Sequence, residues 1–359
     1  MLRGKSLPGI CFAVGFAAAL SCDTGRNLQI APPANREDRL LKVEIPIGLP
    51  PIQFPDGRPP TEAAFELGRR LFYDKNLSLD GSVSCSSCHN PRYGFSDNRP
   101  VAEGVGSRKG KRNSPTLFNV AFGRTFQLDG SVTTLEAQTD APLTGVSEMA
   151  HNPAALEIRL RDNSIYRSMF ERAYGPGTIT AAKAAKALTT FERLILSGNS
   201  LYDRYAYLGN QKALSQPAAR GLALFTGRGK CSVCHQLGKE FALFTDGLYH
   251  NLGVGLNVRG VLTDLGRFNV TKANEDRGAF KTPTLRSVTQ TRPYMHDGSL
   301  ASLTEVVEFY SRGGAPNPYQ SKLIRPLHLE AQEKIDLLAF LESLNGEPLP
   351  HLGPPEGEQ

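Results

Sequence analysis

The pattern Cys-x-x-Cys-His occurs twice in this chain, at residues 85–89 and 231–235. Two thiols at this spacing attach covalently to the vinyl groups of a porphyrin, and the histidine that follows ligates the iron, as in c-type haem. Neighbouring cysteines also occur in two other kinds of site. A zinc site would need two further ligands at finger-like spacing, and a reductase dithiol needs no adjacent histidine. The two complete copies therefore predict two covalent haem c groups, held by Cys85, Cys88 and His89 and by Cys231, Cys234 and His235.

Two haem motifs predict two haem domains, and 359 residues are enough to give each domain its own core. The helical patterns are separated by long loops, which suits cytochrome c domains because the haem replaces much of the side-chain core. We therefore predict a mainly α protein with two cytochrome c-like haem domains. The expected helices cover residues 61–72, 181–196, 217–225, 303–310 and 330–344.

The two halves repeat each other at a constant offset of 168 residues. Between residues 115 and 135, nine of 21 positions are identical to the position 168 further along, whereas ordinary residue usage predicts about one or two. We interpret the chain as an internal duplication, in which residues 296–316 serve the second haem as residues 128–148 serve the first. The identical pairs are Pro115/Pro283, Thr116/Thr284, Leu117/Leu285, Val120/Val288, Arg124/Arg292, Asp129/Asp297, Gly130/Gly298, Ser131/Ser299 and Leu135/Leu303.

The domain organisation follows from the halves. Residues 61–210 are predicted to form the domain of the first haem, and residues 211–346 the domain of the second. Residues 23–60 are rich in proline and lack helical periodicity, which predicts a tether and an extended lead-in. Residues 347–359 are predicted to be a flexible tail.

Residues 1–22 predict an export signal. The basic residues Arg3 and Lys5 precede an apolar run that is too short to span a bilayer, and small residues follow it. Residues 19–22 resemble a bacterial lipoprotein cleavage site, although leucine is commoner at the first of these positions, and an ordinary cleaved signal is the alternative. We expect a periplasmic protein, with a lipid anchor at Cys22 if the lipoprotein interpretation holds.

The charge pattern argues against nucleic acid as a partner. The net charge of +6 falls to +4 when Arg3 and Lys5 leave with the signal, and no dense stripe of Lys and Arg follows. The one basic cluster, residues 108–112, is interpreted as a solvated loop.

Beyond the haem motifs, the sequence resembles the bacterial dihaem cytochrome c peroxidase and MauG family over residues 60–345. The resemblance implies a peroxide-reactive first haem, an electron-relaying second haem, hydrogen peroxide as substrate and a small electron donor such as cytochrome c or a cupredoxin. The segments that carry it are Arg112-Asn113-Ser114-Pro115-Thr116-Leu117, Asp129-Gly130, Glu148-Met149, Thr282-Pro283-Thr284-Leu285 and Pro293-Tyr294-Met295-His296-Asp297-Gly298.

For the first haem, the resemblance implies His89 as the proximal ligand and a distal pocket of Gln138, Pro142 and Glu148. Splitting peroxide requires a group that takes a proton from one oxygen and returns it to the other, which is typically worth about 10²–10⁴-fold in rate. We expect Glu148 to be this group and Gln138 to be its hydrogen-bonding partner. Without the resemblance, Glu148 would be interpreted as a surface or helix-start glutamate.

Many family peroxidases carry a distal histidine in the loop after the first motif, and this ligand must leave before peroxide binds. The matching residue here is Val105, and no other histidine lies between His89 and His151. We therefore expect an open or water-occupied sixth position and activity without reductive activation.

For the second haem, the family's far-side ligand is Met in the peroxidases and Tyr in MauG. The family's ligand position falls on Tyr310, which the internal repeat pairs with Pro142. Met295 is the first alternative, although the family often has Phe there, and His250 is the second. An anionic Tyr310 ligand would lower the reduction potential and favour MauG-like chemistry.

The family places a Trp between its haems, whereas this chain contains no Trp and has Leu128 at that position. Electrons would then have to pass through haem edges or tyrosines. The family also binds calcium between its domains, and the resemblance places Asn113, Thr291 and Pro293 at that site, where oxygen ligands with several waters suit Ca²⁺.

The other histidines receive structural interpretations. His296 is expected to pack or to hydrogen-bond near a haem propionate, and His151, His328 and His351 are expected at the surface.

Three functions compete at this point. The first is a periplasmic peroxidase that reduces hydrogen peroxide to water. The second is a MauG-like oxidase that modifies a residue on a protein substrate; Tyr310 favours it and the missing Trp weakens it. The third is a plain electron-transfer cytochrome, against which Val105 and Glu148 argue.

Overall fold

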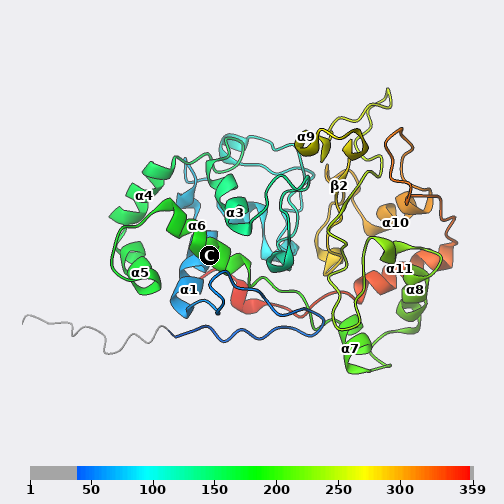
Figure 1. Ribbon diagram of the computed structural model, residues 1–359, viewed down its shortest axis with the longest axis horizontal. Helices are drawn as coiled ribbons and strands as arrows, with labels where there is room; N and C mark the ends of the chain where they lie inside the picture. Colours follow the sequence, from blue (N-terminus) through cyan, green and yellow to red (C-terminus); the bar gives the residue numbers. More distant parts are fainter. Residues whose placement is uncertain (1–38, 356–359) are drawn as a thin grey trace, which may run out of the picture. The chain divides into compact units, whose positions relative to one another are not determined.

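The computed structural model describes residues 39–355, which are mostly helical with little sheet (Figure 1). None of the helices in this range has the length and apolar composition that a membrane crossing requires. The predicted export signal and Cys22 lie outside the described residues. The helices are α1 (Glu62–Tyr73), α2 (Cys85–Cys88), α3 (Leu135–Thr144), α4 (Pro153–Asp162), α5 (Ser164–Tyr174), α6 (Ala181–Glu192), α7 (Leu201–Leu208), α8 (Gln216–Thr226), α9 (Phe268–Thr271), α10 (Leu303–Ser311) and α11 (Ala331–Glu342), and the antiparallel strands are β1 (Tyr249–His250) and β2 (Phe280–Lys281).

The first core forms where α1 packs against α6 and α5. Thr61 begins α1 as its N-cap, because its side chain accepts a hydrogen bond from the backbone N–H of Ala64. Gly68 allows the two helices to approach closely, since a Cβ there would lie 1.9 Å from the backbone oxygen of Ala187. Phe191 of α6 packs among the aromatic rings of α1.

The second core uses the same arrangement with different residues. Helix α8 packs against α11, and a Cβ at Gly221 would lie 2.0 Å from the backbone oxygen of Asp336. Phe225, Phe244 and Phe340 form its aromatic centre. Gly221, Asp336 and Phe340 therefore correspond to Gly68, Ala187 and Phe191 of the first core.

Local geometry also repeats at the offset of 168 residues. The isolated bridge between Phe126 and Val132 recurs between Tyr294 and Leu300. The short 3₁₀ helix Val120–Phe122 recurs as Val288–Gln290, and α3 and α10 begin 168 residues apart. In the first half α6 packs against α3, and in the second half α11 packs against α10 in the same way.

A buried ion pair ties the lead-in segment to the second half. The guanidinium of Arg286 donates to both carboxylate oxygens of Asp203 at 2.6 and 2.8 Å and to the carbonyl of Gly48, and both ionic side chains are fully buried. Leu49 and Ile52 are buried in the first core. Residues 39–60, the described part of the predicted tether, form no helix, as expected. They pack against both halves of the protein and are not a free linker.

The predicted tail also differs from expectation in its described part. Leu352 is completely buried in the first core, and its carbonyl accepts a hydrogen bond from the hydroxyl of Tyr73 at 2.5 Å. Residues 347–355 therefore cover the first half, so the prediction of a flexible tail is wrong there. The sequence did not predict this packing, because a segment rich in Pro and Gly has no periodic apolar pattern.

Each of the five predicted helices is present, with ends shifted by a few residues. The largest shift is in α6, which ends at Glu192 instead of residue 196, because the next residues form tight turns such as the bond from the N–H of Leu194 to the carbonyl of Phe191. Four helices of eight residues or more were not predicted, namely α3, α4, α5 and α7.

Candidate functional site

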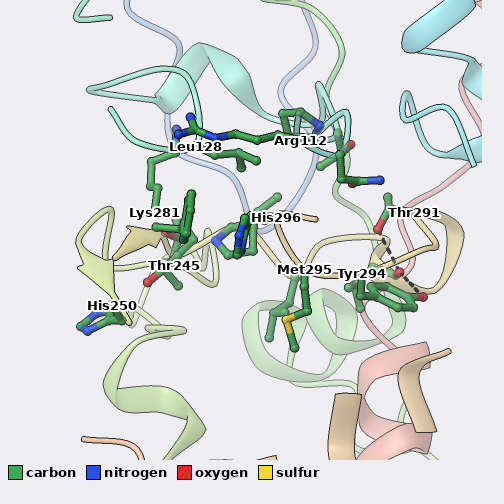
Figure 2. Close-up of a pocket in the computed structure, with 18 of the residues that line it drawn as sticks. Arg112, Leu128, Thr245, His250, Lys281, Thr291, Tyr294, Met295 and His296 are labelled. Carbon is green, nitrogen blue, oxygen red and sulfur yellow. Dashed lines mark hydrogen bonds between the residues drawn. The ribbon is translucent and has the colours of Figure 1, made fainter. Parts of the chain in front are cut away.

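Both Cys-x-x-Cys-His motifs line one cavity of about 2250 Å³. Figure 2 shows some of the residues that line it. Pockets for ordinary small ligands measure about 300–1,000 Å³. The cavity is therefore large enough for more than one large cofactor. Its lining is more apolar than polar, as a porphyrin face requires.

The two motif histidines are held in the same way. His89 Nδ1 lies 3.1 Å from the carbonyl of Phe95, and His235 Nδ1 lies 2.9 Å from the carbonyl of Phe244. Because a carbonyl can only accept, each Nδ1 carries the proton and each Nε2 keeps its lone pair for a metal. Burial lowers the pKa of both imidazoles, which keeps them neutral and able to ligate.

The four motif cysteines form no disulfide with one another. Burial, with the nearby Glu192 and Cys88, raises the pKa of Cys85, and burial raises the pKa of Cys88, Cys231 and Cys234 to about 11. A reductase dithiol has a lowered thiol pKa instead. The motifs therefore fit covalent attachment of two haem c groups better than dithiol chemistry.

Glu148 lies in the wall of the first motif's half of the cavity. Its carboxylate folds over Gly145, where a Cβ would lie 2.2 Å from its Oε2. No described residue forms a hydrogen bond or ion pair with this carboxylate, and burial raises its pKa. Gln138 and Pro142 of α3 line the same cavity, and Gln138 Oε1 is buried without a partner. The three predicted distal residues therefore share one wall.

Val105 is 3% exposed, and its backbone contacts the backbone of Glu148 in this wall. Its N–H donates to the carbonyl of Glu148 at 2.8 Å. At the adjacent Gly104, a Cβ would lie 2.4 Å from the same carbonyl oxygen, so only glycine allows this approach. The loop that would present a distal histidine instead holds the backbone of Glu148.

Comparison with known proteins gives a consistent result. Residues 62–212 match the family described as di-haem cytochrome c peroxidase. The chain is 39% identical over 300 residues to the methylamine utilization protein MauG of Methylorubrum extorquens, covering 83% of this chain and 82% of that protein. It is 38% identical over 331 residues to the cytochrome-c peroxidase IdrP1 of Pseudomonas sp. (strain SCT), covering 85% and 87%.

The chain belongs to the di-haem cytochrome c peroxidase and MauG family. A crystal structure of a MauG-like protein associated with microbial copper homeostasis matches with a TM-score of 0.76 and 35% identity, covering 86% of this chain and 96% of that one. This dihaem protein is accordingly an oxidoreductase of the cytochrome-c peroxidase type, and its family carries two haem c groups.

In the second half of the dihaem protein, Tyr310 and Met295 both line the cavity. The hydroxyl of Tyr310 has no hydrogen-bond partner among the described residues. Burial raises its pKa, and the nearby Cys231 and Cys234 act in the same direction. Tyr310 therefore lies close to the second attachment site with a free hydroxyl, at the position on α10 that Pro142 has on α3.

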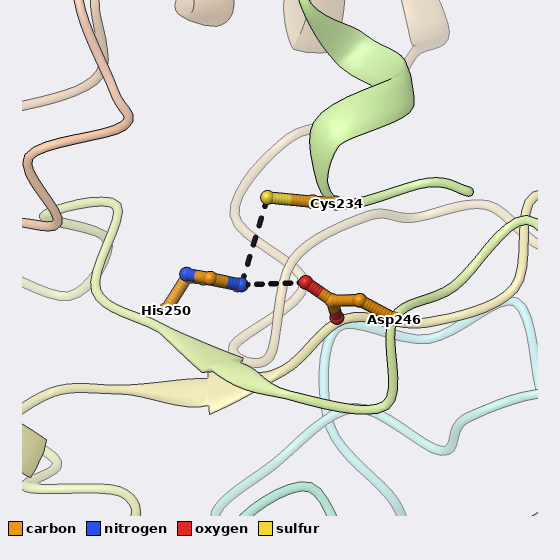
Figure 3. Close-up of side chains that lie close together, drawn as sticks. All are labelled: Cys234, Asp246 and His250. Atoms are coloured by element: carbon orange, nitrogen blue, oxygen red, sulfur yellow. Dashed lines mark hydrogen bonds and ion pairs between the residues drawn. The ribbon is translucent and has the colours of Figure 1, made fainter.

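The side chain of His250 contacts Asp246 and Cys234 (Figure 3). Its Nε2 lies 2.9 Å from a carboxylate oxygen of Asp246 and 3.5 Å from the sulfur of Cys234. The three ligand atoms are close enough to hold a metal ion. A thioether bond to haem c removes the Cys234 thiolate, however, and zinc sites normally have four ligands. We therefore interpret His250 and Asp246 as a hydrogen-bonded pair beside the second haem and not as a metal centre.

The predicted calcium residues Asn113, Thr291 and Pro293 line one cavity. Asn113 donates its Nδ2 to the carbonyl of Arg99 at 2.7 Å, so its Oδ1 points away from that bond. Within residues 39–355, neither this oxygen nor the backbone carbonyls of Thr291 and Pro293 accept a hydrogen bond. Unpartnered oxygens of this kind fit a hard cation such as Ca²⁺.

The backbone N–H of Lys281 donates to the carbonyl of Leu128 at 2.8 Å and so joins Leu128 to the second half. Figure 2 labels both residues in the cavity. Phe280 stacks on His296 with ring centroids 3.7 Å apart, so the expectation that His296 packs is met. Arg112 lies 5.3 Å above the Phe280 ring. The sequence did not single out Phe280 or Lys281, because the two-residue strand that presents them leaves no periodic signal.

Two buried groups near the first site were not anticipated from the sequence. His151 is 4% exposed, so its predicted surface position is wrong. Its backbone N–H donates to the carbonyl of Leu143, which holds His151 against the end of α3. Glu192, which the sequence analysis did not single out, is 7% exposed and lines the cavity. Its position on the same helical face as the buried Leu188, four residues earlier, is the signal that could have found it.

Proposed function

We propose that this dihaem protein is a periplasmic peroxidase that reduces hydrogen peroxide to water with electrons from a small redox protein. The observation that carries the proposal is Glu148, a carboxyl group with a raised pKa and no partner among the described residues, in the wall of the first motif's cavity. When bound, the haem groups supply the iron at which peroxide reacts and the route for electrons.

The protein's own residues supply the proton chemistry. Glu148 is positioned by its backbone contact with Val105, and its raised pKa brings it closer to neutral pH, where it can both take and return a proton. Gln138 offers its unpartnered Oε1 and its amide to the same space. Val105 cannot ligate iron, which supports an open position and activity without reductive activation.

Among the residues of this chain, Tyr310 favours the MauG-like alternative. Its free hydroxyl near the second attachment site fits the far-side ligand that the resemblance implies. Relatives of both names match this chain at similar identity, so a protein substrate stays the second candidate. The electron-transfer cytochrome loses support, because the family is enzymatic.

The test is the visible and electron paramagnetic resonance spectrum of the isolated protein, before and after hydrogen peroxide. We expect a high-spin component that responds to peroxide, followed by rapid oxidation of reduced cytochrome c. A long-lived spectral change with poor cytochrome turnover would favour the MauG-like function. A fully low-spin spectrum that ignores peroxide would contradict both.

We also propose that Asn113, Thr291 and Pro293 hold Ca²⁺ between the halves, as their unpartnered oxygens suggest. Treatment with a chelator should alter the haem spectra, and added Ca²⁺ should restore them. An Asn113→Ala variant should resemble the chelated protein; a variant whose spectra match the untreated wild type would remove Asn113 from the site.

The duplication and the export signal complete the proposal. The repeated bridges, turns and helix pairs support an origin of both halves from one haem domain. Periplasmic location and lipidation at Cys22 rest on the sequence, and mass spectrometry of the mature N-terminus distinguishes a lipidated Cys22 from an ordinary cleaved end.

A further inference from the structure

Glu192 is a second buried carboxyl group in the wall of the cavity, close to Cys85 of the first motif. It ends α6 where that helix packs on α3. Its Oε2 lies 2.8 Å from the hydroxyl oxygen of Thr139, the residue that follows Gln138. No basic side chain forms an ion pair with it among residues 39–355. A buried carboxylate without a cation is costly, so its protonation state needs an explanation.

The hydroxyl group of Thr139 faces the Glu192 carboxyl group and can bond to it in either protonation state. Thr139 Oγ1 lies 2.9 Å from the carbonyl of Leu135, and Thr189 Oγ1 lies 2.8 Å from the carbonyl of Ala185. Thr139 has one hydroxyl proton, which it can donate either to the carbonyl of Leu135 or to Glu192. When the proton goes to Leu135, a protonated Glu192 donates to Thr139, and when Glu192 is ionised, Thr139 donates to Glu192 Oε2.

The same position in the second half has no polar group. The helix pair α8 and α11 matches α1 and α6 through their glycines, which places Leu341 where Glu192 lies. The offset of 168 places Val307 at the position of Thr139. Val307 and Leu341 are buried and line the same cavity. The fold therefore does not require the Thr139–Glu192 pair, and the pair belongs to the first site.

Few charged groups face Glu192. Burial raises the pKa of Glu192 to about 7; the hydrogen bond from Thr139 and the nearby Arg193 oppose the shift, and Glu136 of α3 adds to it. The α2 helix contributes the Cys85 thiol. Helix α1 presents aromatic rings to this end of α6, and Glu157 of α4 bonds to the opposite end, at Ala181.

We propose that Glu192 is a protonated carboxylic acid of the first haem cavity and delivers one of the two protons that peroxide reduction consumes. The inference rests on the proposed peroxidase function. Reduction of one hydrogen peroxide to two waters breaks the O–O bond and takes up two electrons, from the donor protein, and two protons. Glu148 moves a proton from one peroxide oxygen to the other, Glu192 releases one of the two protons consumed, and solvent supplies the second.

Thr139 can stabilise Glu192 after it has released its proton. Once Glu192 is ionised, the hydroxyl of Thr139 can turn from the carbonyl of Leu135 to the carboxylate, because both acceptors lie within 3 Å of it. Uptake of a proton from solvent in the cavity returns Thr139 to Leu135. Thr139 is thus a positioning residue that stabilises both states of the acid.

Difference infrared spectroscopy of the haem-loaded protein tests the protonation directly. We expect a carboxylic acid C=O band near neutral pH that disappears in Glu192→Gln. The same variant should lower peroxide turnover by about a hundredfold, and it should abolish the fall in wild-type activity expected as the pH rises through about 7. Glu136→Gln is the matched control, since this half-exposed glutamate bonds to Arg193, and it should keep the band and the rate.

Glu192→Leu copies the second half and guards against a purely structural effect. It should fold, bind both haems with an unchanged visible spectrum, and lose turnover as Glu192→Gln does. Wild-type turnover in either variant, or an unchanged carboxylic acid band in Glu192→Gln, would overturn the proposal. If the wild type does not consume peroxide, the peroxidase function fails, while the infrared band still decides whether Glu192 is protonated.

Discussion

In the first half, α3 carries Gln138 and Thr139 on the cavity wall; in the second, α10 carries Val306 and Val307 at the matching positions. The helix that packs behind each wall differs in the same way, with Glu192 on α6 and Leu341 on α11. The backbone arrangement is shared, yet the polar groups are confined to one side.

Under the proposed function, this difference assigns proton chemistry to the first half and electron relay to the second. Proton transfer requires groups that titrate near the working pH, and Glu148 and Glu192 both have a raised pKa. An electron relay needs no proton donors, and an apolar wall suits it. The exception in the second wall is Tyr310, whose hydroxyl makes it the one polar group on α10 that faces an attachment site.

The largest effect is expected for Glu148→Gln. Removal of the carboxylate should slow peroxide turnover by about 10²–10⁴-fold, because proton transfer to the leaving oxygen is lost. Stopped-flow kinetics measures this, and reduction of the second haem should be unaffected. Glu308→Gln is the matched control in the second half, where Glu308 pairs with Lys334 on the surface. Equal slowing in both variants would remove the assignment of proton chemistry to the first half.

A second test concerns a charge that only one half contains. Arg286 corresponds to the buried Phe118 at the offset of 168, and its guanidinium is fully buried against Asp203. Arg286→Met should lower the free energy of unfolding by about 3–5 kcal/mol, because an unpaired carboxylate is left buried. Chemical denaturation measures the change. Adding Asp203→Asn should recover part of it, whereas no recovery would show that the charge is not the cause.

The pH dependence of stability gives a third test. Burial raises the pKa of Glu192 to about 7 from 4.5, so the folded state binds a proton more tightly than the unfolded state. The contribution of Glu192 is complete below about pH 4.5 and is lost as the pH rises through about 7, by about 3 kcal/mol at most. Denaturation at pH 5 and pH 8 should show this loss in the wild type and not in Glu192→Gln. Equal pH dependence in both would mean that Glu192 is ionised throughout.

The sequence predicts most of what has a local pattern. The haem motifs are found because covalent attachment fixes their spacing, and α1 because Thr61 caps an amphipathic run. Helix α3 was missed, since it contains Pro142 and its apolar residues follow no clear stripe. The resemblance nevertheless identified three residues of its wall, which the structure brings together.

What the sequence could not predict arises from packing between distant segments. Glu192 belongs to the first site only because α6 crosses α3, and the burial that raises its pKa comes from that crossing. Phe280 and Lys281 reach the wall through a strand pair whose register no short pattern encodes. The packing of Leu352 on the first core likewise depends on a return of the chain over nearly its whole length.

The smallest expected effect tests whether the two cores are built alike. Ala in place of Gly68 or Gly221 would bring a Cβ within 1.9 or 2.0 Å of a backbone oxygen on the facing helix, so each helix pair must move apart. Each substitution should lower the free energy of unfolding by about 1–3 kcal/mol, even though Ala favours an isolated helix over Gly by about 1 kcal/mol. Because both oxygens belong to backbone, side-chain adjustment cannot relieve either contact. A loss in only one variant would show that the cores differ in packing, and the correspondence of Glu192 with Leu341 would then need another basis.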